Sequence, residues 1–382
     1  MITTINNEHK ELNFSSEREQ SQACLNSAEH EKNQGRKVLN VPNLRFPEFQ
    51  GEWEEYRIED ITENISSGRC KSHSPNGKYN LYGSTGIIGK TDEACYEGNL
   101  VLVARVGANA GSLQIINELC GITDNTLIIK PKEVDAQYLY FFLQHFNLNR
   151  LIFGSGQPLI TGGMLKKVKV SLGTVQEQNK LTKLLSLLDE RIATQNKIID
   201  KLQSLIKGIA QKIVHSNKTN VHLSECVECS YSTLQESDVC EHDAYPVYGA
   251  NGIVGYLNNY NTEGEAVYII KDGSGVGTVS YVTGKCSATG TLNTLQAKEG
   301  YSLQYLYYLL KVFNFEPYKT GMAIPHIYFK DYGKAKVFCP SYTEQLQYAR
   351  LLSAIDSELS IEKNFLTSLS LQKQYLLRHM FI

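Results

Sequence analysis

The sequence predicts an α+β protein with a pseudo-twofold internal repeat, in which each of two globular α/β modules is followed by a long helix. Three observations predict this fold class. A tyrosine- and glycine-rich motif occurs twice, strand-like segments surround both copies, and a heptad pattern of apolar residues follows each copy. We expect the two long helices to form an antiparallel coiled coil.

Composition and length set the domain organisation. At 382 residues, with 42% hydrophobic and 20% charged residues, the chain has room for two or three globular domains of about 150 residues each. The expected segments are a mobile polar tail over 1–40, a first module over 41–174, a long helix and linker over 175–220, a second module over 221–340 and a second long helix over 341–382. No apolar run approaches the ~18 residues of a membrane span. The polar N-terminal residues lack a signal-peptide pattern, and the nine cysteines are irregularly spaced, so we expect reduced thiols in the cytoplasm.

The repeat extends over more than a hundred residues. The segment YNLYGSTGIIG at 79–89 recurs as YPVYGANGIVG at 245–255, an offset of 166 positions. Further pairs at this offset, or at one residue more, are Arg105 and Lys271, Gly107 and Gly273, Gly111 and Gly277, Pro158 and Pro325, and Asp189 and Asp356. Each module therefore contains the same elements in the same order.

Within each module the first part is β-rich. The segments 100–104 and 266–270 are β-branched or aromatic and are bounded by glycine, which predicts strands. Clusters of Tyr, Leu and Phe predict a short helix over 136–146 and again over 302–313.

The heptad pattern predicts long helices over about 175–215 and 342–380. Its first seam consists of Leu181, Leu185, Leu188, Ile192, Gln195, Ile199, Leu202, Ile206, Ile209 and Ile213. Its second seam consists of Tyr348, Leu352, Ile355, Leu359, Glu362, Leu366, Leu369, Lys373, Leu376 and Met380. Each helix alone could instead pack on its own module, but ~40 residues at ~1.5 Å each span ~60 Å, more than a small module covers. Two equal seams in one chain favour packing on each other.

Two polar residues occupy equivalent seam positions near the middle of the helices. An antiparallel pair of equal helices brings these midpoints together, so Gln195 and Glu362 are expected to hydrogen-bond and to set the helix register. A parallel pair would require the intervening module to span back the full helix length.

The glycine-rich segments at 107–111 and 273–277 could also be interpreted as nucleotide-binding loops. A phosphate-binding loop needs glycines that open a helix, whereas Gly273-Ser-Gly275-Val-Gly277 continues into a strand pattern. We therefore expect tight hairpin turns at 107–111 and 273–277. A sugar- or nucleotide-binding enzyme would instead predict helices after Gly111 and Gly277.

No catalytic motif is present in the sequence. It contains no Pro-Pro pair, as the Asn-Pro-Pro-aromatic loop of amino-group base methyltransferases requires, and no nucleophile elbow. Cys226-Val-Glu-Cys229 with Cys240 and His242 could in principle bind zinc, but the first module has no matching set, and we expect plain reduced cysteines and no metal.

Charge neither demands nor excludes a nucleic-acid partner. Residues 44–174 hold 13 Lys and Arg against 14 Asp and Glu, and residues 221–340 hold 8 against 12. Local basic clusters exist at Arg69 with Lys71, at Lys166 and Lys167 with Lys169, and at Lys330 with Lys334 and Lys336. A lysine pair on a strand is usually a solvated face.

The order of several motifs along the chain resembles that of a known protein family. A Leu-Arg-Phe-Pro-Glu-Phe segment (44–49) precedes the Tyr-x-x-Tyr-Gly turn, and Gly-Gln-Pro-Leu-Ile (156–160) precedes a long helix that contains Leu-Asp-Glu-Arg-Ile (188–192). This duplicated order, over residues 41–382, resembles the specificity subunit of type I restriction–modification systems. The second copy departs from the pattern with Ala-Ile-Pro-His-Ile at 323–327, which puts in doubt any contact carried from one copy to the other.

The resemblance implies a non-catalytic chain. Each module would be a target-recognition domain for one half of a split double-stranded DNA site, and the helices would set the gap between the halves. Two modification subunits would use S-adenosylmethionine to methylate adenine, and restriction subunits would join them for cleavage with ATP and magnesium. This chain would bind no cofactor and contact no membrane. The alternative is a duplicated coiled-coil scaffold that binds protein partners.

Loops are expected to contact base edges, because base recognition needs side chains that reach into a groove. The candidates in the first module are Ser84, Thr85, Arg105, Asn109, Gln157 and Thr161, with Lys166 and Lys167 on phosphates. The candidates in the second module are Asn251, Lys271, Ser274 and His326, with Lys330 and Lys334 on phosphates. The Arg105 and Lys271 position could instead stabilise a glycine-rich hairpin.

Overall fold

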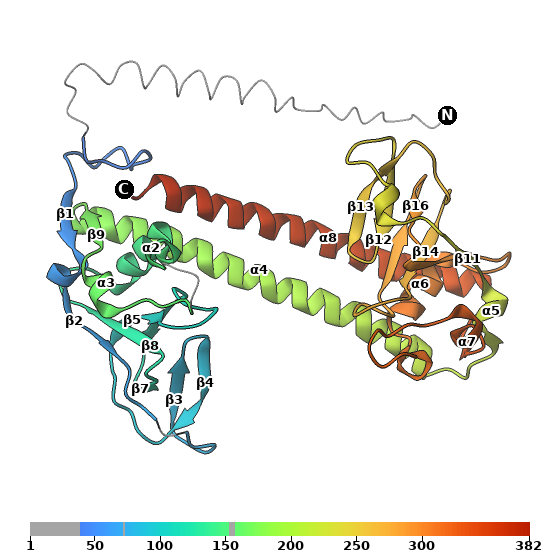
Figure 1. The fold of residues 1–382 in the computed structure, drawn as a ribbon, viewed down its shortest axis with the longest axis horizontal. Coiled ribbons are helices and arrows are strands. Elements are labelled where there is room, and N and C mark those ends of the chain that lie inside the picture. Colours follow the sequence, from blue (N-terminus) through green and yellow to red (C-terminus); the bar gives the residue numbers. More distant parts are fainter. Residues whose placement is uncertain (1–38, 72, 153–156) are drawn as a thin grey trace. The chain divides into compact units, whose positions relative to one another are not determined.

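The structure is a computed structural model that describes residues 39–71, 73–152 and 157–382 (Figure 1). The described residues form two compact units. Unit 1 comprises the described residues up to Ser186 together with Lys373–Ile382, and unit 2 comprises Leu187–Gln372. Nearly all of the polar segment expected over 1–40 lies outside the described residues.

Unit 1 contains three small sheets. A four-stranded antiparallel sheet has the order β2-β8-β5-β6, a three-stranded sheet has the order β4-β3-β7, and β1 pairs with β9. Their bounds are β1 Glu54–Arg57, β2 Thr62–Ser67, β3 Tyr79–Gly83, β4 Gly86–Thr91, β5 Asn99–Ala104, β6 Leu113–Asn117, β7 Cys120–Ile122, β8 Thr126–Pro131 and β9 Lys169–Leu172. The predicted strand at 100–104 is β5, which is buried from Leu100 onward because both of its faces pack into apolar clusters, Val101 and Val103 in one and Leu100 and Leu102 in the other.

Unit 2 has the same sheets in the same order. The four-stranded sheet is β11-β17-β14-β15, the three-stranded sheet is β13-β12-β16, and β10 pairs with β18. Their bounds are β10 Val221–His222, β11 Val227–Tyr231, β12 Tyr245–Gly249, β13 Gly252–Leu257, β14 Ala266–Ile270, β15 Val279–Val282, β16 Ser287–Ala288, β17 Leu292–Ala297 and β18 Lys336–Val337. The internal repeat of the sequence is therefore a repeat of sheet topology.

Short helices cover the sheets. In unit 1 they are η1 Ile58–Ile61, α2 Ala136–Phe146, η2 Leu148–Leu151 and α3 Gly162–Lys166. In unit 2 they are α5 Leu223–Cys226, η3 Glu236–Asp238, α6 Leu303–Lys311, η4 Glu316–Tyr318 and α7 Phe329–Tyr332. Helix α2 has the predicted bounds, since the Asp135 carboxylate caps its N-terminus and Asn147, with φ 56°, ends it. Helix α6 ends two residues before the predicted Phe313, at the non-helical Val312.

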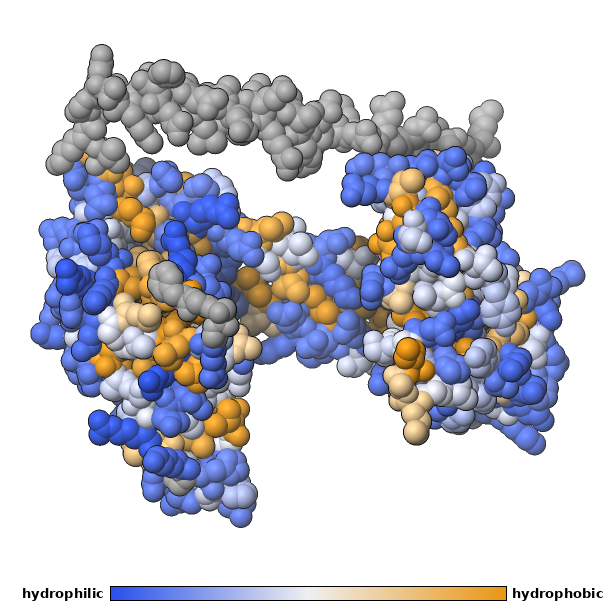
Figure 2. Space-filling model, viewed as in Figure 1, coloured by the Kyte–Doolittle hydropathy of each residue, from blue (hydrophilic) through white to orange (hydrophobic). Residues whose placement is uncertain are grey.

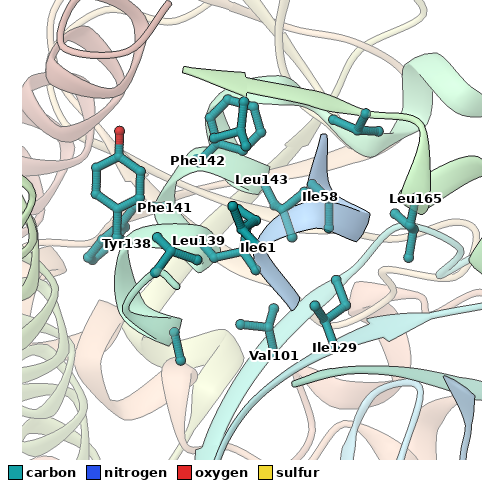
Figure 3. Packing of buried hydrophobic residues seen from close by; sticks show 14 of the residues in the cluster. Ile58, Ile61, Val101, Ile129, Tyr138, Leu139, Phe141, Phe142, Leu143 and Leu165 are labelled. Atoms are coloured by element: carbon teal, nitrogen blue, oxygen red, sulfur yellow. The ribbon is translucent and has the colours of Figure 1, made fainter. Parts of the chain in front are cut away.

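The core of unit 1 lies between α2, η1 and the four-stranded sheet. Figure 3 shows Tyr138, Leu139 and Phe142 from α2 packed near Ile58 and Ile61 of η1. All five side chains are almost completely buried. Burial raises the pKa of Tyr138, whose hydroxyl donates a hydrogen bond to the carbonyl oxygen of Ser171.

The long helices α4 Val175–His215 and α8 Tyr342–His379 cover the ranges that the heptads predict. Within unit 2 they pack antiparallel, because residues later on α4 contact residues earlier on α8. Arg191 lies over the ring of Phe365, Gln195 contacts Glu362, and Ile199, Ile206 and Ile213 share a core with Leu359, Leu352 and Ala349. None of the predicted seam side chains is exposed. This confirms the prediction of an antiparallel coiled coil over the alternative of separately packed helices.

The C-terminal end of α8 packs into the core of unit 1. Met380 and Phe381 are buried, and they share this core with Leu181 and Leu185 of α4. The ring of Phe381 lies 5.7 Å from that of His145. Met380 and Phe381 are thus core residues of unit 1.

Candidate nucleic-acid interface

The two glycine-rich segments are hairpin turns, as predicted. In unit 1 the turn joins β5 to β6, and the amide of Gly111 donates to the carbonyl oxygen of Ala104 at 2.9 Å. In unit 2 it joins β14 to β15, and Gly277 donates to Ile270 at 2.9 Å. Gly107, Gly111, Gly273 and Gly277 all have positive φ, which only glycine adopts readily. The helices that a nucleotide-binding enzyme requires after these turns are absent, since β6 and β15 follow instead.

A proline-containing segment is hydrogen-bonded to each glycine turn. In unit 1 the amide of Gly107 donates to Pro158 at 3.1 Å, and that of Ile160 donates to Arg105 at 2.9 Å. In unit 2 Gly273 donates to Pro325 and Ile327 donates to Lys271, both at 2.9 Å. The equivalence of Pro158 and Pro325 in the sequence therefore reflects one shared contact.

A second loop joins the glycine turn to the tyrosine-containing hairpin. In unit 1 the amide of Arg105 donates to Asn125 and that of Thr123 donates to Tyr82. In unit 2 Lys271 donates to Thr291 and Thr289 donates to Tyr248. Asn125 and Thr291 were not among the sequence candidates. The repeat offset relates them, but nothing in their own residue types singles them out.

The candidates in unit 1 have free polar groups on these loops. Thr85, Asn109 and Gln157 are exposed, and Ser84 is half-buried beside Thr85 in the β3–β4 turn. Arg105 donates to the hydroxyl of Ser67 at 3.4 Å, while its buried Nε has no hydrogen-bond partner among the described residues. Its guanidinium therefore retains donors for a ligand.

Three other candidates in unit 1 lie around α3. The Thr161 hydroxyl accepts from the amide of Met164 at 3.3 Å and caps this helix, so it has a structural role. Lys166 and Lys167 do not lie on a strand. The cap begins a short helix that ends at Lys166, and β9 starts at Lys169. Both lysines are exposed, whereas Lys169 forms an ion pair with Glu55 at 2.7 Å.

The candidates in unit 2 lie on the equivalent loops. Asn251 is exposed in the β12–β13 turn, and Ser274 is exposed in the glycine turn. The Lys271 ammonium lies 5.6 Å from the centre of the Tyr231 ring. Here Lys271 has an aromatic contact where Arg105 in unit 1 has Ser67.

The other candidates in unit 2 follow the proline segment. The His326 ring makes an edge contact with Tyr328, with 5.0 Å between ring centres. Lys330 and Lys334 are exposed, and Lys330 Nζ lies 5.0 Å from the centre of the Tyr328 ring.

The predicted contact between the two polar seam residues is present in unit 2. Gln195 Nε2 donates to the carboxylate of Glu362 and, at 3.2 Å, to its backbone carbonyl oxygen. Gln195 is buried and Glu362 half-buried. An apolar residue at either position would leave the partner's polar group unpaired in the seam.

The cysteines considered for zinc do not gather around one point. Cys226 Sγ lies 3.7 Å from Cys339 Sγ, and this thiol–thiol hydrogen bond lowers the pKa of Cys226. Within residues 39–71, 73–152 and 157–382, no group of three His, Cys, Asp or Glu side chains is arranged to hold a metal ion. Among the helices of the described residues, none has the length and apolarity to cross a membrane.

Each unit thus brings a glycine turn, a proline segment and a β-hairpin together, and these loops expose polar side chains. Comparisons with known proteins identify the family. The family model of the type I restriction modification DNA specificity domain matches residues 50–204 and again residues 217–370. The chain therefore belongs to the family of type I restriction–modification specificity subunits, which confirms the resemblance.

Curated relatives agree with this assignment, and a solved structure shows the same fold. A putative type I specificity subunit of Mycoplasma genitalium is 26% identical over 342 residues, covering 81% of this chain and 88% of that protein. The MjaVIII specificity subunit of Methanocaldococcus jannaschii is 28% identical over 187 residues, covering 44% of this chain and 43% of that protein. The crystal structure of the type I restriction–modification S subunit from M. genitalium has the same fold, with a TM-score of 0.68 at 19% identity, covering 90% of this chain and 99% of that one.

Proposed function

We propose that each unit recognises one half of a bipartite double-stranded DNA target, and that the chain itself catalyses no reaction. The observation that carries this proposal is the duplicated loop arrangement within a chain of the specificity-subunit family. Base recognition needs polar side chains on loops that reach into a groove, and each unit presents such side chains from three adjoining loops.

Differences between the units support two different half-sites. Gln157 of unit 1 corresponds to Ile324 of unit 2, and both side chains are exposed beside the equivalent proline. An amide can form paired hydrogen bonds with adenine, whereas an isoleucine side chain cannot. At this one position of the repeat, unit 1 therefore has a hydrogen-bonding side chain and unit 2 an apolar one.

Partner subunits would supply the chemistry. We infer that two modification subunits bind S-adenosylmethionine and methylate adenine, and that restriction subunits cleave DNA with ATP and magnesium. The unit surfaces are not basic overall, so the partners would also provide part of the phosphate contact. A cytoplasmic location follows from this function.

Mapping genomic methylation in the source strain and reconstituting the chain with the co-encoded methyltransferase tests the proposal. We expect a bipartite methylated motif, and specific binding of that motif by the complex in a mobility-shift assay. A complex that binds random and target duplexes equally, or a chain that binds only protein partners, would favour the scaffold alternative. Duplexes altered in one half at a time then assign each half to a unit.

A further inference from the structure

The two most exposed large apolar side chains in the described part of the chain lie on one turn of unit 2. Met322 is 105% exposed and Ile324 67% exposed, relative to the reference state of each residue. Exposed apolar side chains contribute nothing to folding. Figure 2 shows that apolar surface on the visible face of unit 2 forms small patches within hydrophilic surroundings. We call residues Gly321–Ile324 the apolar tip.

The apolar tip is held in a defined conformation. Thr320 and His326 exchange two backbone hydrogen bonds of 2.9 and 2.8 Å across its base. Gly321 has φ +87°, and a Cβ atom there would lie 2.4 Å from the carbonyl oxygen of Ile324. The tip is therefore a closed turn that only glycine permits, and its backbone is held in this conformation before any ligand binds.

The base of the tip is part of the proposed DNA interface. Pro325 accepts a hydrogen bond from Gly273, and Ile327 donates one to Lys271, so the tip adjoins the glycine turn that carries Lys271 and Ser274. Residues 317–330 contain two lysines and one histidine, of which Lys319 is paired with Glu316 at 2.6 Å and His326 lies opposite Asp272 of the glycine turn. The occupant that we assign to the tip is DNA, because the tip adjoins the loop that carries Lys271 and Ser274 of the proposed interface.

A base edge offers apolar side chains one favourable group in the major groove. The exposed edges of A, G and C carry hydrogen-bonding groups, whereas thymine also presents its C5 methyl group. Met322 and Ile324 have no side-chain donor, and neither can accept a strong hydrogen bond. Resting on the proposed function, we propose that the apolar tip recognises thymine methyl groups in the half-site of unit 2.

The position of Ile324 supports this assignment. Its equivalent in unit 1 is Gln157, a candidate for hydrogen bonding to a base. The same position would thus recognise a base by an amide in one unit and by apolar contact in the other.

Replacing thymine with deoxyuridine tests the proposal, because it removes only the methyl group. The wild-type chain, assembled with its methyltransferase, is titrated with target duplexes carrying one such replacement at a time. We expect one or two replacements in the half-site of unit 2 to weaken binding about three- to tenfold, as the loss of one buried methyl predicts. Met322→Ala and Ile324→Ala should bind the thymine duplex more weakly and lose this dependence, whereas Met322→Leu should keep it. Leu119→Ala removes a 40% exposed leucine from unit 1 and should behave as wild type.

Three results overturn the proposal. They are an unchanged affinity for every deoxyuridine duplex, an undiminished methyl dependence in both alanine variants, and a half-site of unit 2 that contains no A·T pair. Weaker assembly of the alanine variants with the methyltransferase in the absence of DNA would assign the tip to a protein partner instead. Failure of the proposed function is distinguishable, because the wild-type complex would then bind no sequence specifically.

Discussion

Arg105 and Lys271 occupy the same position of the repeat but differ in their surroundings. Arg105 has one long hydrogen bond, and its Nε has no partner in the part of the chain that the structure describes, whereas Lys271 lies over the Tyr231 ring. The backbone of both residues is fixed by hydrogen bonds to two neighbouring loops. At this position the backbone hydrogen bonds are the same in both units, and only the side chain differs between them.

Loss of a phosphate contact and loss of a base contact should change DNA binding in different ways. Lys167→Ala should weaken binding to all sequences and lower the salt slope by about one unit, because a phosphate contact releases counterions. Gln157→Ala should instead cost about 1–3 kcal/mol and relax only one half of the bipartite site. Binding titrations over a range of salt, on duplexes altered in one half at a time, measure both effects.

Lys169→Ala provides the control, since this nearby lysine is paired with Glu55. We expect its salt slope to remain close to that of the wild type. If Gln157→Ala altered both halves equally, the assignment of one unit to one half-site would be wrong.

At the scale of elements, the Gln195–Glu362 pair is the polar interruption of an otherwise largely apolar seam in unit 2. Gln195→Leu should destabilise unit 2 by about 1–3 kcal/mol, because it leaves the half-buried Glu362 carboxylate without its donor. Gln195→Asn should cost less, since it keeps an amide donor. Denaturant unfolding of the full chain measures the difference.

A double variant checks the cause. Gln195→Leu combined with Glu362→Leu should recover most of the lost stability, because both polar groups are then replaced. Equal destabilisation by the single and double variants would contradict the assignment of the loss to an unpaired carboxylate.

A second prediction concerns the residues that follow the C-terminal end of α8. Phe381 is 3% exposed and its ring centre lies 5.4 Å from that of Tyr138, so Phe381→Ala should destabilise unit 1 by about 3–5 kcal/mol. Ile382→Ala, which truncates an exposed neighbour, should have little effect. Comparable losses in the two variants would mean that Phe381 is not a core residue.

His145, whose ring stacks on that of Phe381, should make the stability of unit 1 depend on pH. Burial lowers the pKa of His145 below its ordinary 6.5, and the charge of Arg150 adds to this, although the hydrogen bond to the Leu377 carbonyl oxygen opposes it. The unfolded chain therefore takes up a proton at a higher pH than the folded chain does. The stability that neutral His145 contributes is present above about pH 6.5 and is lost as the pH falls towards its lowered pKa.

Unfolding midpoints at pH 7.5 and 5.5 measure this loss. His145→Gln, which cannot titrate, should show a smaller decrease in stability than the wild type between these values. An identical decrease in both proteins would exclude His145 as the source.

At the scale of the whole molecule, we predict that the purified chain alone forms no product. Incubation of the chain with S-adenosylmethionine, ATP, magnesium and target DNA should give neither methylation nor cleavage. Methylation should begin on addition of the modification subunit, and cleavage on further addition of the restriction subunit. Turnover by the purified chain alone would refute the non-catalytic proposal.

The sequence by itself determined the repeat, the hairpin turns and both long helices. Heptad spacing is a local property, so it predicted that Gln195 and Glu362 would meet in the seam. Glycine at 107, 111, 273 and 277 identified turns, because positive φ is itself a local requirement.

Only the tertiary structure decided which distant loops adjoin. The contact of Arg105 with Asn125, the pairing of Cys226 with Cys339, and the burial of Phe381 in unit 1 all join segments whose own sequences do not specify a partner. The helix that ends at Lys166 was not predicted for a related reason, since it is too short to show a period. The spacing of apolar residues predicts which face of a helix or strand is buried. The element that packs on this face depends on the packing of the whole unit.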